Sequence, residues 1–407
     1  MSFLLRIPQL LTRLFPLQGG RQPVHHAVYD TGLLAVCFSL LFLGLIMVAS
    51  ASVHTAEQRF GDPLYYFWRQ LLYTGIGCWV GLFIIKIPIR VWQKVSSLLL
   101  MTGIIFLVLV LIPPFGREIN GSMRWLHIGS MSIQPSEFIK LIMVLYLAGY
   151  LVRRGEEVRR SLVGFLKPIF VVCIITGLFL LEPDYGATVV LFATVLGMLF
   201  IAGVPIRQFN LWIIIIGFVL GALVISAPYR LERLVTFVNP WADPFNSGFQ
   251  LTQALIAIGR GGFLGVGLGN SVQKLTYLPE AHTDFIFAIL AEELGLVGIL
   301  VTISLFSYLI IKAFSIALKA ELQRQIYAAY LSYGIGLLLG LQTIINLGVN
   351  MGLLPTKGLT LPLMSYGGSS LLVTCMMLAL LLRIDFELRL KQRISNKYAN
   401  RLALNTH

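Results

Sequence analysis

The segment Leu278 to Phe287, which reads LPEAHTDFIF, brings an acidic side chain to the point where a long polar stretch meets an apolar run. Asp284 lies at that boundary, and a carboxylate placed there is a candidate general base. The polar stretch, residues 229–283, is the only long non-hydrophobic interval in the sequence. Because long loops in compact proteins usually carry function, we expect the chemistry to take place beside this segment.

Two oppositely charged residues, Glu137 and Lys140, lie in the motif PSEFIKL at the start of another apolar run. Their spacing of three residues puts them on one face of a helix, where they can pair. Charged residues near membrane spans are costly, so their positions are informative. The pair has two interpretations: a salt bridge that makes both charges tolerable in lipid, or a lysine that Glu137 positions to bind a diphosphate.

Arg124 and Trp125 are adjacent in NGSMRWLHIG, in a predicted outer loop. A tryptophan at a membrane interface is usually an anchor in the aromatic belt. An arginine beside a tryptophan also suits stacking on a sugar or binding a phosphate, and the sequence favours neither interpretation.

The last polar loop, LLPTKGLTLPLMSYGGSSLL at 353–372, combines Lys357 with the hydroxyls of Ser365, Ser369 and Ser370 before an apolar run. The N-terminus of a helix favours anions, so these residues are candidates for anion binding. Ordinary helix caps are the alternative, and the residues by themselves favour the caps.

Within the long polar stretch, residues 250–258 (QLTQALIAI) have helical spacing but are too short to span a bilayer, which predicts an amphipathic helix at the interface. A glycine-rich run that contains Arg260 follows at 259–270. Its spacing matches no phosphate-binding motif, so we favour tight packing of a re-entrant loop over a phosphate site.

Four further acidic residues lie near or within apolar runs, where a carboxylate is costly to bury. Glu182 and Asp184 lie in the turn LEPDYG, where we favour a helix N-cap for Asp184. Glu292 and Glu293 are about 12 Å deeper than Asp284 if the helix is continuous. That depth predicts an ionic partner, a protonated carboxyl or a water-filled cavity around them.

The elements that must position these residues are membrane helices. The chain has 407 residues, of which 57% are hydrophobic and 12% charged, far from the composition of soluble domains. Apolar runs predict ten transmembrane helices in an all-α polytopic membrane protein, with a long outer loop between helices 7 and 8. Their predicted centres lie near Leu40, Gly77, Phe106, Leu145, Ile175, Thr194, Gly217, Val301, Gly336 and Met377.

Charge predicts the orientation, because loops rich in Lys and Arg stay in the cytoplasm. With the N-terminus inside, cytoplasmic segments hold 21 of the 31 Lys and Arg residues, which favours an N-in, C-in topology. The same bias accounts for the net charge of +13, so we do not interpret the basicity as nucleic-acid binding. We expect a cytoplasmic tail at 1–29, a membrane domain at 30–384 with its catalytic region in the outer loop 229–283, and a cytoplasmic tail at 385–407.

The order of these motifs resembles the SEDS family of bacterial shape and division proteins over residues 30–390. The resemblance is carried by NGSMRWLHIGSMSIQPSEFIKL, LEPDYGATVVL, NPWADPFNSGFQLTQALIAIGRGG, GLGNSVQKLTYLPEAHTDFIFAILAEELG, LPTKGLTLPLMSYGGSS and LLRID. The segments NPWADPFNSGFQLTQ and VQKLTYLPEAHTDF look more like the cell-division branch than the elongation branch.

The resemblance implies a peptidoglycan glycosyltransferase that polymerises lipid II at the outer face of the bacterial plasma (inner) membrane, at the division septum. It implies a class B penicillin-binding transpeptidase and other divisome proteins as partners, and a divalent cation, Mg²⁺ or Mn²⁺, whose ligands are not legible. Asp284 matches the family's essential aspartate, and Trp125, Glu137 and Lys140 match other positions that the family needs. In the implied reaction undecaprenyl diphosphate leaves the lipid-linked strand. Arg124, Lys140, Arg260 or the turn from Ser365 to Ser370 would stabilise this leaving diphosphate.

Two other functions compete with this one. A lipid II flippase would use ten spans and intramembrane charges, but transporters often carry inverted repeats and offer polar groups to both leaflets, and the sequence shows neither clearly. A scaffold for division proteins would explain the spans but not the charged pair at Glu137 and Lys140.

Overall fold

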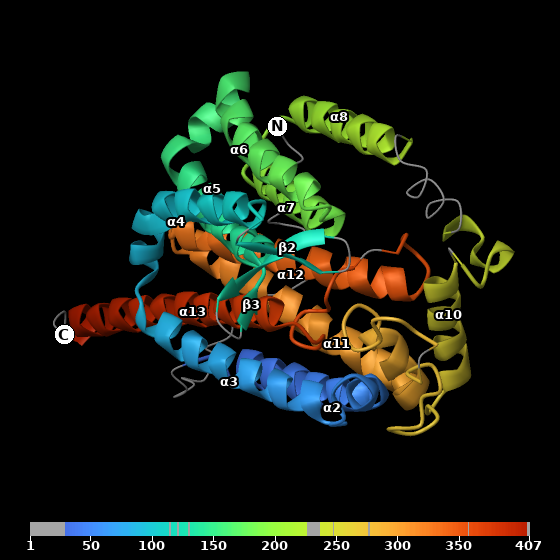
Figure 1. Cartoon of the computed structure of the whole chain (residues 1–407). Coiled ribbons are helices and arrows are strands. Elements are labelled where there is room, and N and C mark those ends of the chain that lie inside the picture. Colours follow the sequence, from blue (N-terminus) through green and yellow to red (C-terminus); the bar gives the residue numbers. More distant parts are fainter. Residues whose placement is uncertain are drawn as a thin grey trace.

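The structure is a computed structural model, and it describes residues 29–404 except 114, 120, 121, 129, 130, 226–236, 247, 276 and 357. Long helices dominate it, and one small sheet lies beside them (Figure 1). The elements in chain order are α2 (Thr31–Phe60), α3 (Tyr65–Lys86), α4 (Ile89–Val110), β1 (Gly116–Ile119), β2 (Ser122–Ile128), β3 (Met131–Ile133), α5 (Pro135–Arg160), α6 (Leu162–Leu181), α7 (Tyr185–Ile201), α8 (Ile206–Ile225), the 3₁₀ helix η1 (Pro240–Ala242), α10 (Phe249–Gly261), α11 (Ile286–Leu322), α12 (Ile326–Asn350) and α13 (Gly368–Leu404).

Each of the ten predicted span centres lies within one of these helices. Among the described residues, six helices are long and apolar enough to cross a membrane, namely α2, α4, α5, α6, α11 and α12. Helix α7 is also apolar but has 17 residues. The polytopic helical architecture is therefore confirmed, whereas the count of ten spans and the N-in, C-in orientation stay predictions.

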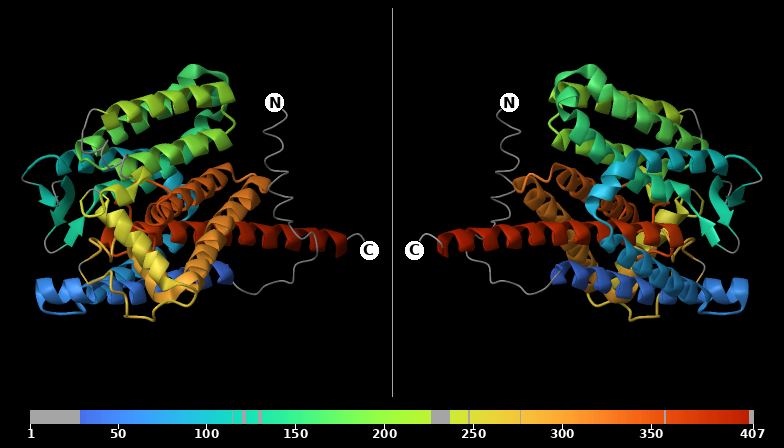
Figure 2. Two further views of the ribbon diagram at one scale, coloured as in Figure 1. Left: turned by 90° about the vertical axis from the view of Figure 1, so that its right-hand side faces the viewer. Right: turned by 90° about the vertical axis from the view of Figure 1, so that its left-hand side faces the viewer.

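Helix α12 is the centre of the bundle, because it contacts α5, α7, α11 and α13. Around it, α2 and α3 lie on one side of α13, and α5 to α8 lie on the other (Figure 2). Most residues of α12 are buried, including the amides of Gln342, Asn346 and Asn350. Buried polar groups need hydrogen-bond partners, so α12 must fix the segments that it contacts.

The expectation of an all-α protein is wrong in one place. Residues predicted as an outer loop at 113–134 contain a three-stranded antiparallel sheet in the order β1-β2-β3. Ile119 pairs with Ser122, and the two residues between them in the sequence are Asn and Gly, which form the strongest short hairpin signal. The sheet carries Arg124 and Trp125 on β2, next to the start of α5.

The glycine-rich run packs tightly against α11, as the sequence predicts. Helix α11 is kinked at Gly295, whose φ of 63° belongs to the left-handed region that favours glycine. The kink lets the backbone amides of Val266 and Gly267 donate to the carbonyls of Glu292 and Glu293 at 3.0 and 3.1 Å. A Cβ at Gly295 would lie 2.3 Å from the nitrogen of Gly265, so backbone approaches backbone here.

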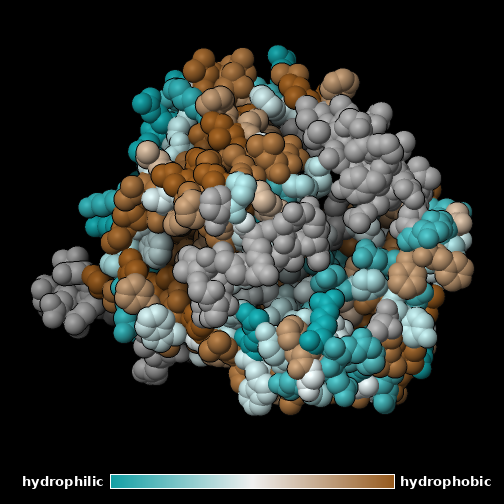
Figure 3. Space-filling view, viewed as in Figure 1, coloured by the Kyte–Doolittle hydropathy of each residue, from teal (hydrophilic) through white to brown (hydrophobic). Residues whose placement is uncertain are grey.

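The predicted amphipathic helix at 250–258 is confirmed as α10, which packs on α11. Hydrophilic residues gather at the lower right of the molecule in Figure 3, where Figure 1 has α10 and the loop that precedes α11. Hydrophobic residues cover the upper left of the same view, over α4 to α6. The polar face of the protein therefore adjoins the segment that leads to Asp284.

Candidate active site

The backbone of Asp284 is held by helix α12. Its carbonyl accepts hydrogen bonds from the side-chain amides of Asn346 and Asn350, both at 3.0 Å. The amide oxygen of Asn350 in turn accepts from the backbone nitrogen of Ala288 at 3.1 Å, in the first turn of α11. Two asparagines one helical turn apart thus fix the turn that carries Asp284, and the Asp284 carboxylate takes no part in these hydrogen bonds.

The carboxylate of Asp284 is not a helix cap. The N-cap of α11 is Phe285, and it makes no side-chain capping bond. None of the described residues donates a hydrogen bond to the carboxylate, and the side chain is half-buried rather than sealed from solvent. Asp284 therefore does not cap α11, and its carboxylate is free of hydrogen bonds from the described residues.

The environment of Asp284 makes it a weaker acid than usual. Burial of the carboxyl and the negative charges of Glu280 and Asp184 raise its pKa, and the positive charge of Arg124 lowers it, with a net result of about 7. A carboxyl with this pKa exchanges a proton near neutral pH, which is the property that general-base catalysis requires.

Arg124 joins the sheet to the turn between α6 and α7. Its guanidinium donates to the backbone carbonyls of Glu182 at 2.9 Å and Pro183 at 2.6 Å. Trp125 is half-buried on the same strand, and the pairing of β2 with β1 shifts register here, so that Arg124 has no partner on β1. Arg124 is the member of the pair whose charge acts on Asp284.

The turn between α6 and α7 carries two acidic residues, Glu182 and Asp184. Asp184 is the N-cap of α7, as predicted: its carboxylate accepts from the backbone nitrogen of Ala187 at 3.1 Å and from Ser136 Oγ at 3.2 Å. Glu182 is fully buried, and neither of its carboxyl oxygens has a hydrogen-bond partner among the described residues. Burial, followed by the charge of Asp184, raises the pKa of Glu182 to about 8.

Glu137 and Lys140 form the predicted ion pair in the first turns of α5, with Lys140 Nζ 2.9 Å from Glu137 Oε1. The lysine side chain is 1% exposed, so its amine is enclosed by protein. Glu137 also lies in the first turn, where the helix dipole favours a negative charge. The geometry agrees with the salt-bridge interpretation, and it leaves the diphosphate role of Lys140 untested.

The three serines near the start of α13 make hydrogen bonds within the protein. Ser365 Oγ donates to the carbonyl of Thr283, beside Asp284, and accepts from Leu361 N at 2.8 Å. Ser369 Oγ accepts from the backbone nitrogen of Gln134 at 2.9 Å, and Ser370 Oγ accepts from Thr360 Oγ1 at 2.8 Å. These bonds tie the loop 358–370 to the site. Lys357 lies outside the described residues.

Arg260 belongs to a neighbouring network rather than to the Asp284 site. It pairs with Glu292 at 2.8 Å, and Lys274 pairs with Glu293 at 2.8 Å. Ser50 on α2 also donates to Glu293, at 2.7 Å. Of the three alternatives for Glu292 and Glu293, the structure shows the ionic partners. The Arg260 side chain is 43% exposed.

The described part of the chain shows no set of side chains that could serve as ligands of a divalent cation. No group of three or more His, Cys, Asp or Glu side chains there is arranged to hold a metal ion. The described residues therefore assign no ligands to a divalent cation, and no catalytic step is derived through one.

Sequence reasoning missed several residues of the site. Asn346 and Asn350 hold Asp284, and their signal was available, because polar residues spaced i, i+4 within an apolar span are unusual. Gly358 was also missed: a Cβ built on it would lie 2.9 Å from Asp284 Oδ2. No local pattern indicates that approach, since the two residues are far apart in sequence.

The chain is similar to proteins of one family over most of its length. The sequence model of a family described as cell cycle protein, which covers FtsW, RodA and SpoVE, matches residues 31–390. A probable peptidoglycan glycosyltransferase FtsW of Nitrosococcus halophilus is 55% identical over 360 residues, which cover 88% of this chain and 93% of that protein. A protein with the same description from Coxiella burnetii is 52% identical over 359 residues, or 88% of this chain and 96% of that one.

Solved structures agree with these relatives. One chain, from work on the structural coordination of polymerization and crosslinking by a peptidoglycan synthase complex, superposes with a TM-score of 0.74 at 29% identity, and covers 88% of this chain and 98% of its own. The rod shape determining protein RodA of Thermus thermophilus superposes with a TM-score of 0.66 at 29% identity, and covers 89% of this chain and 98% of its own.

Proposed function

Because the chain belongs to the FtsW, RodA and SpoVE family of cell cycle proteins, we propose that it is a peptidoglycan glycosyltransferase that polymerises lipid II during septal wall synthesis. The family assignment confirms the resemblance that the motifs carry, and the names of the relatives agree with its cell-division branch. The observation that carries the proposal is the half-buried Asp284 carboxyl, which accepts no hydrogen bond from the described residues and whose pKa is raised to about 7 by burial and by the charges of Glu280 and Asp184.

In the proposed reaction, the 4-hydroxyl of a GlcNAc unit of lipid II attacks the anomeric carbon of MurNAc at the end of a lipid-linked strand. Asp284 accepts the hydroxyl proton as the glycosidic bond forms, and the bond from the anomeric carbon to undecaprenyl diphosphate breaks. General-base catalysis of this kind contributes about 10²–10⁴ in rate. The hydrogen bonds from Asn346 and Asn350 support this role, because they fix the backbone without using the carboxylate.

The departing diphosphate needs positive charge, and Arg124 is the candidate that the contacts favour. The positive charge of Arg124 lowers the pKa of Asp284. An arginine has five N–H donors, and only two nitrogen atoms of Arg124, Nε and one Nη, donate to the carbonyls of the α6–α7 turn. Arg260 is not assigned this role, because it pairs with Glu292 in the neighbouring network. Ser365, Ser369 and Ser370 are proposed to shape the loop rather than to bind the anion, since their hydroxyls have partners in the protein.

The protein is a multi-pass bacterial membrane protein. We further propose ten spans with both termini in the cytoplasm, a site at the outer face, and location at the division septum. A class B penicillin-binding transpeptidase is the proposed partner, and the synthase complex among the similar structures supports it. A divalent cation, Mg²⁺ or Mn²⁺, is proposed to support the reaction, with no ligands assigned.

Polymerisation of purified lipid II tests the function. Wild-type protein, alone and with its class B transpeptidase, is expected to give glycan strands that a gel resolves by length. Liposomes with labelled lipid II test the alternative of a flippase in the same preparation. Movement of lipid II between leaflets without any strand formation, with the partner present, would contradict the glycosyltransferase assignment.

The pH dependence of the rate follows from the pKa of Asp284. A general base works only when ionised, so the initial rate at saturating lipid II is expected to fall about tenfold per pH unit below about 7 and to level off above it. Glu280→Gln removes a negative charge that raises this pKa, so the midpoint of the profile is expected to move to lower pH. A wild-type profile that is flat from pH 5 to 8 would contradict the base assignment.

A small change at Gly358 is expected to displace the catalytic carboxylate. In Gly358→Ala the new methyl group would lie 2.9 Å from Asp284 Oδ2, so the carboxylate must move. We expect at least a tenfold loss of polymerisation with little change in thermal stability, since misplacement by about 1 Å costs as much as 10²-fold in rate. Gly367→Ala is the matched control, because its Cβ meets only ordinary contacts, the closest at 3.5 Å. Equal activity of both variants would remove Gly358 from the site.

A further inference from the structure

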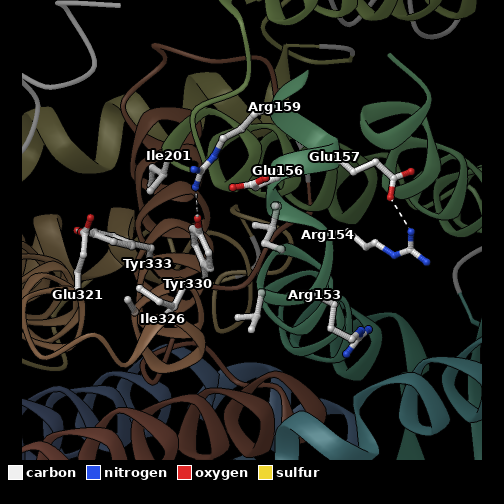
Figure 4. Close-up of a pocket in the computed structure, with 14 residues that line it drawn as sticks. Arg153, Arg154, Glu156, Glu157, Arg159, Ile201, Glu321, Ile326, Tyr330 and Tyr333 are labelled. Atoms are coloured by element: carbon white, nitrogen blue, oxygen red, sulfur yellow. Dashed lines mark hydrogen bonds and ion pairs between the residues drawn. The ribbon is translucent and has the colours of Figure 1, made fainter. Parts of the chain in front are cut away.

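A polar cavity lies at the end of the bundle opposite Asp284. It has a volume of about 710 Å³ and is formed by the end of α5, the last residue of α7, the end of α11 and the start of α12 (Figure 4). Each of these four helices has its other end at the Asp284 site. Helix α12 has 25 residues, so the two sites are about 37 Å apart along it. The proposed glycosyltransferase reaction does not use this cavity.

Two charged groups in the cavity are held in place by tyrosines. Arg159 donates to the carbonyl of Ala202 at 2.6 Å and to the hydroxyl of Tyr330 at 3.3 Å. Glu321 accepts from the hydroxyl of Tyr333 at 3.0 Å. Figure 4 shows Arg159 and Tyr330 pointing toward each other, with Glu321 beside Tyr333 on the adjacent wall. The cavity thus presents a fixed cation and a fixed anion.

Two further charges in the lining, Arg153 and Glu156, make no ion pair with any described residue. Arg154 and Glu157 also border the cavity, but they pair with each other at 2.9 Å on one side of it. Figure 4 shows the Arg153 side chain pointing away from Arg159 and Glu156, so the charges left for a ligand are Arg159 and two glutamates, Glu156 and Glu321. This balance suits a zwitterion and disfavours a ligand with net negative charge, which the glutamates would repel.

The edge of the cavity is apolar and open. Val152 and Ile326 line it and are 38% and 42% exposed, and Leu322 beside it is 65% exposed. In a membrane helix bundle such a surface meets acyl chains. A ligand that satisfies both the charged interior and this apolar edge is amphiphilic, and its head group carries opposite charges.

We propose that this cavity binds the head group of a phospholipid that carries a phosphate and a primary ammonium, as phosphatidylethanolamine does. Arg159 binds the phosphate, Glu156 and Glu321 bind the ammonium, and the acyl chains leave past Val152 and Ile326. Charge-assisted hydrogen bonds of this type are stronger than neutral ones, and pockets between membrane helices are known to take lipid head groups. The site anchors the four helix ends in the leaflet opposite Asp284.

Native mass spectrometry of the full-length protein, released from micelles with defined lipids, tests the proposal. Phosphatidylethanolamine is expected to be retained about tenfold more tightly than phosphatidylglycerol, which lacks the ammonium, or phosphatidylcholine, whose quaternary ammonium donates no hydrogen bond. The double variant Glu156→Gln, Glu321→Gln is expected to lose this preference. Arg159→Gln is expected to weaken all three lipids by a similar factor.

Arg154→Gln is the matched control, because that guanidinium is engaged by Glu157, and it is expected to retain the wild-type preference. Thermal unfolding of each variant identifies misfolded protein, and Glu321→Gln can still accept the bond from Tyr333. Inorganic phosphate separates the two sources of the anion: competition by phosphate at millimolar concentration would show a free-anion site and overturn the lipid assignment. Equal retention of the three lipids by the wild type, or an unchanged preference in the double glutamine variant, would also overturn it.

Discussion

Asp284→Asn is expected to abolish measurable polymerisation of lipid II, with a loss of about 10²–10⁴ in rate. The substitution keeps the size of the side chain but removes its capacity to accept a proton at neutral pH. The fold should survive, because Asn346 and Asn350 bind the backbone carbonyl of residue 284 and not its carboxylate. Gel analysis of strands made by the purified variant, with and without the class B transpeptidase, measures the loss.

Asp62→Asn is a matched control for this experiment. Asp62 is exposed and accepts a hydrogen bond from Leu64 N at 2.9 Å, which an asparagine oxygen also accepts. It should polymerise like the wild type. Lipid II binding and the unfolding temperature of Asp284→Asn should also match the wild type. An asparagine variant that makes strands at the normal rate would show that another group removes the proton.

Lys140→Met is expected to have the second-largest effect, on stability as well as activity. It leaves Glu137 without its partner in a position where the lysine is 1% exposed, and an uncompensated buried charge costs about 3–5 kcal/mol. The unfolding temperature of the purified protein in detergent should fall by many degrees, and polymerisation should fall with it. A variant as stable as the wild type would show that the pair contributes nothing to the fold.

The double variant Glu137→Gln, Lys140→Met separates the two interpretations of this pair. Without either charge, the helix no longer buries an unpaired ion, so the unfolding temperature should recover in large part. If the pair is only a salt bridge, polymerisation recovers as well. If Lys140 contacts the diphosphate, the protein regains stability but stays inactive, and the KM for lipid II or the rate at saturation reports the loss.

The helices could be predicted from the sequence because a bilayer accepts only segments whose backbone is satisfied internally and whose side chains are apolar. That is a local property, so each predicted centre lies within a helix. The amphipathic helix α10, the cap at Asp184 and the Glu137–Lys140 pair were predicted for the same reason. All three depend on residues at most a few positions apart.

The small sheet was not predicted from the sequence. The Asn-Gly and Gly-Ser dipeptides between the strands were legible turn signals, but a long run of apolar helices set the expectation of an all-α chain. Arg124 was therefore placed on a loop beside Trp125. On β2 the guanidinium of Arg124 donates to the carbonyls of Glu182 and Pro183, a contact between distant segments that no local pattern indicates.

What the sequence determined by itself was the class of protein and the acidic residue at the boundary of α11, since composition, hydropathy and motif order are properties of the chain. Only the tertiary structure decided what surrounds that residue. Asn346, Gly358 and Arg124 reach Asp284 from three separate elements, and the charges that set its pKa act through space. Hydrogen bonds and Coulomb interactions depend on distance between atoms, and folding alone brings these atoms together.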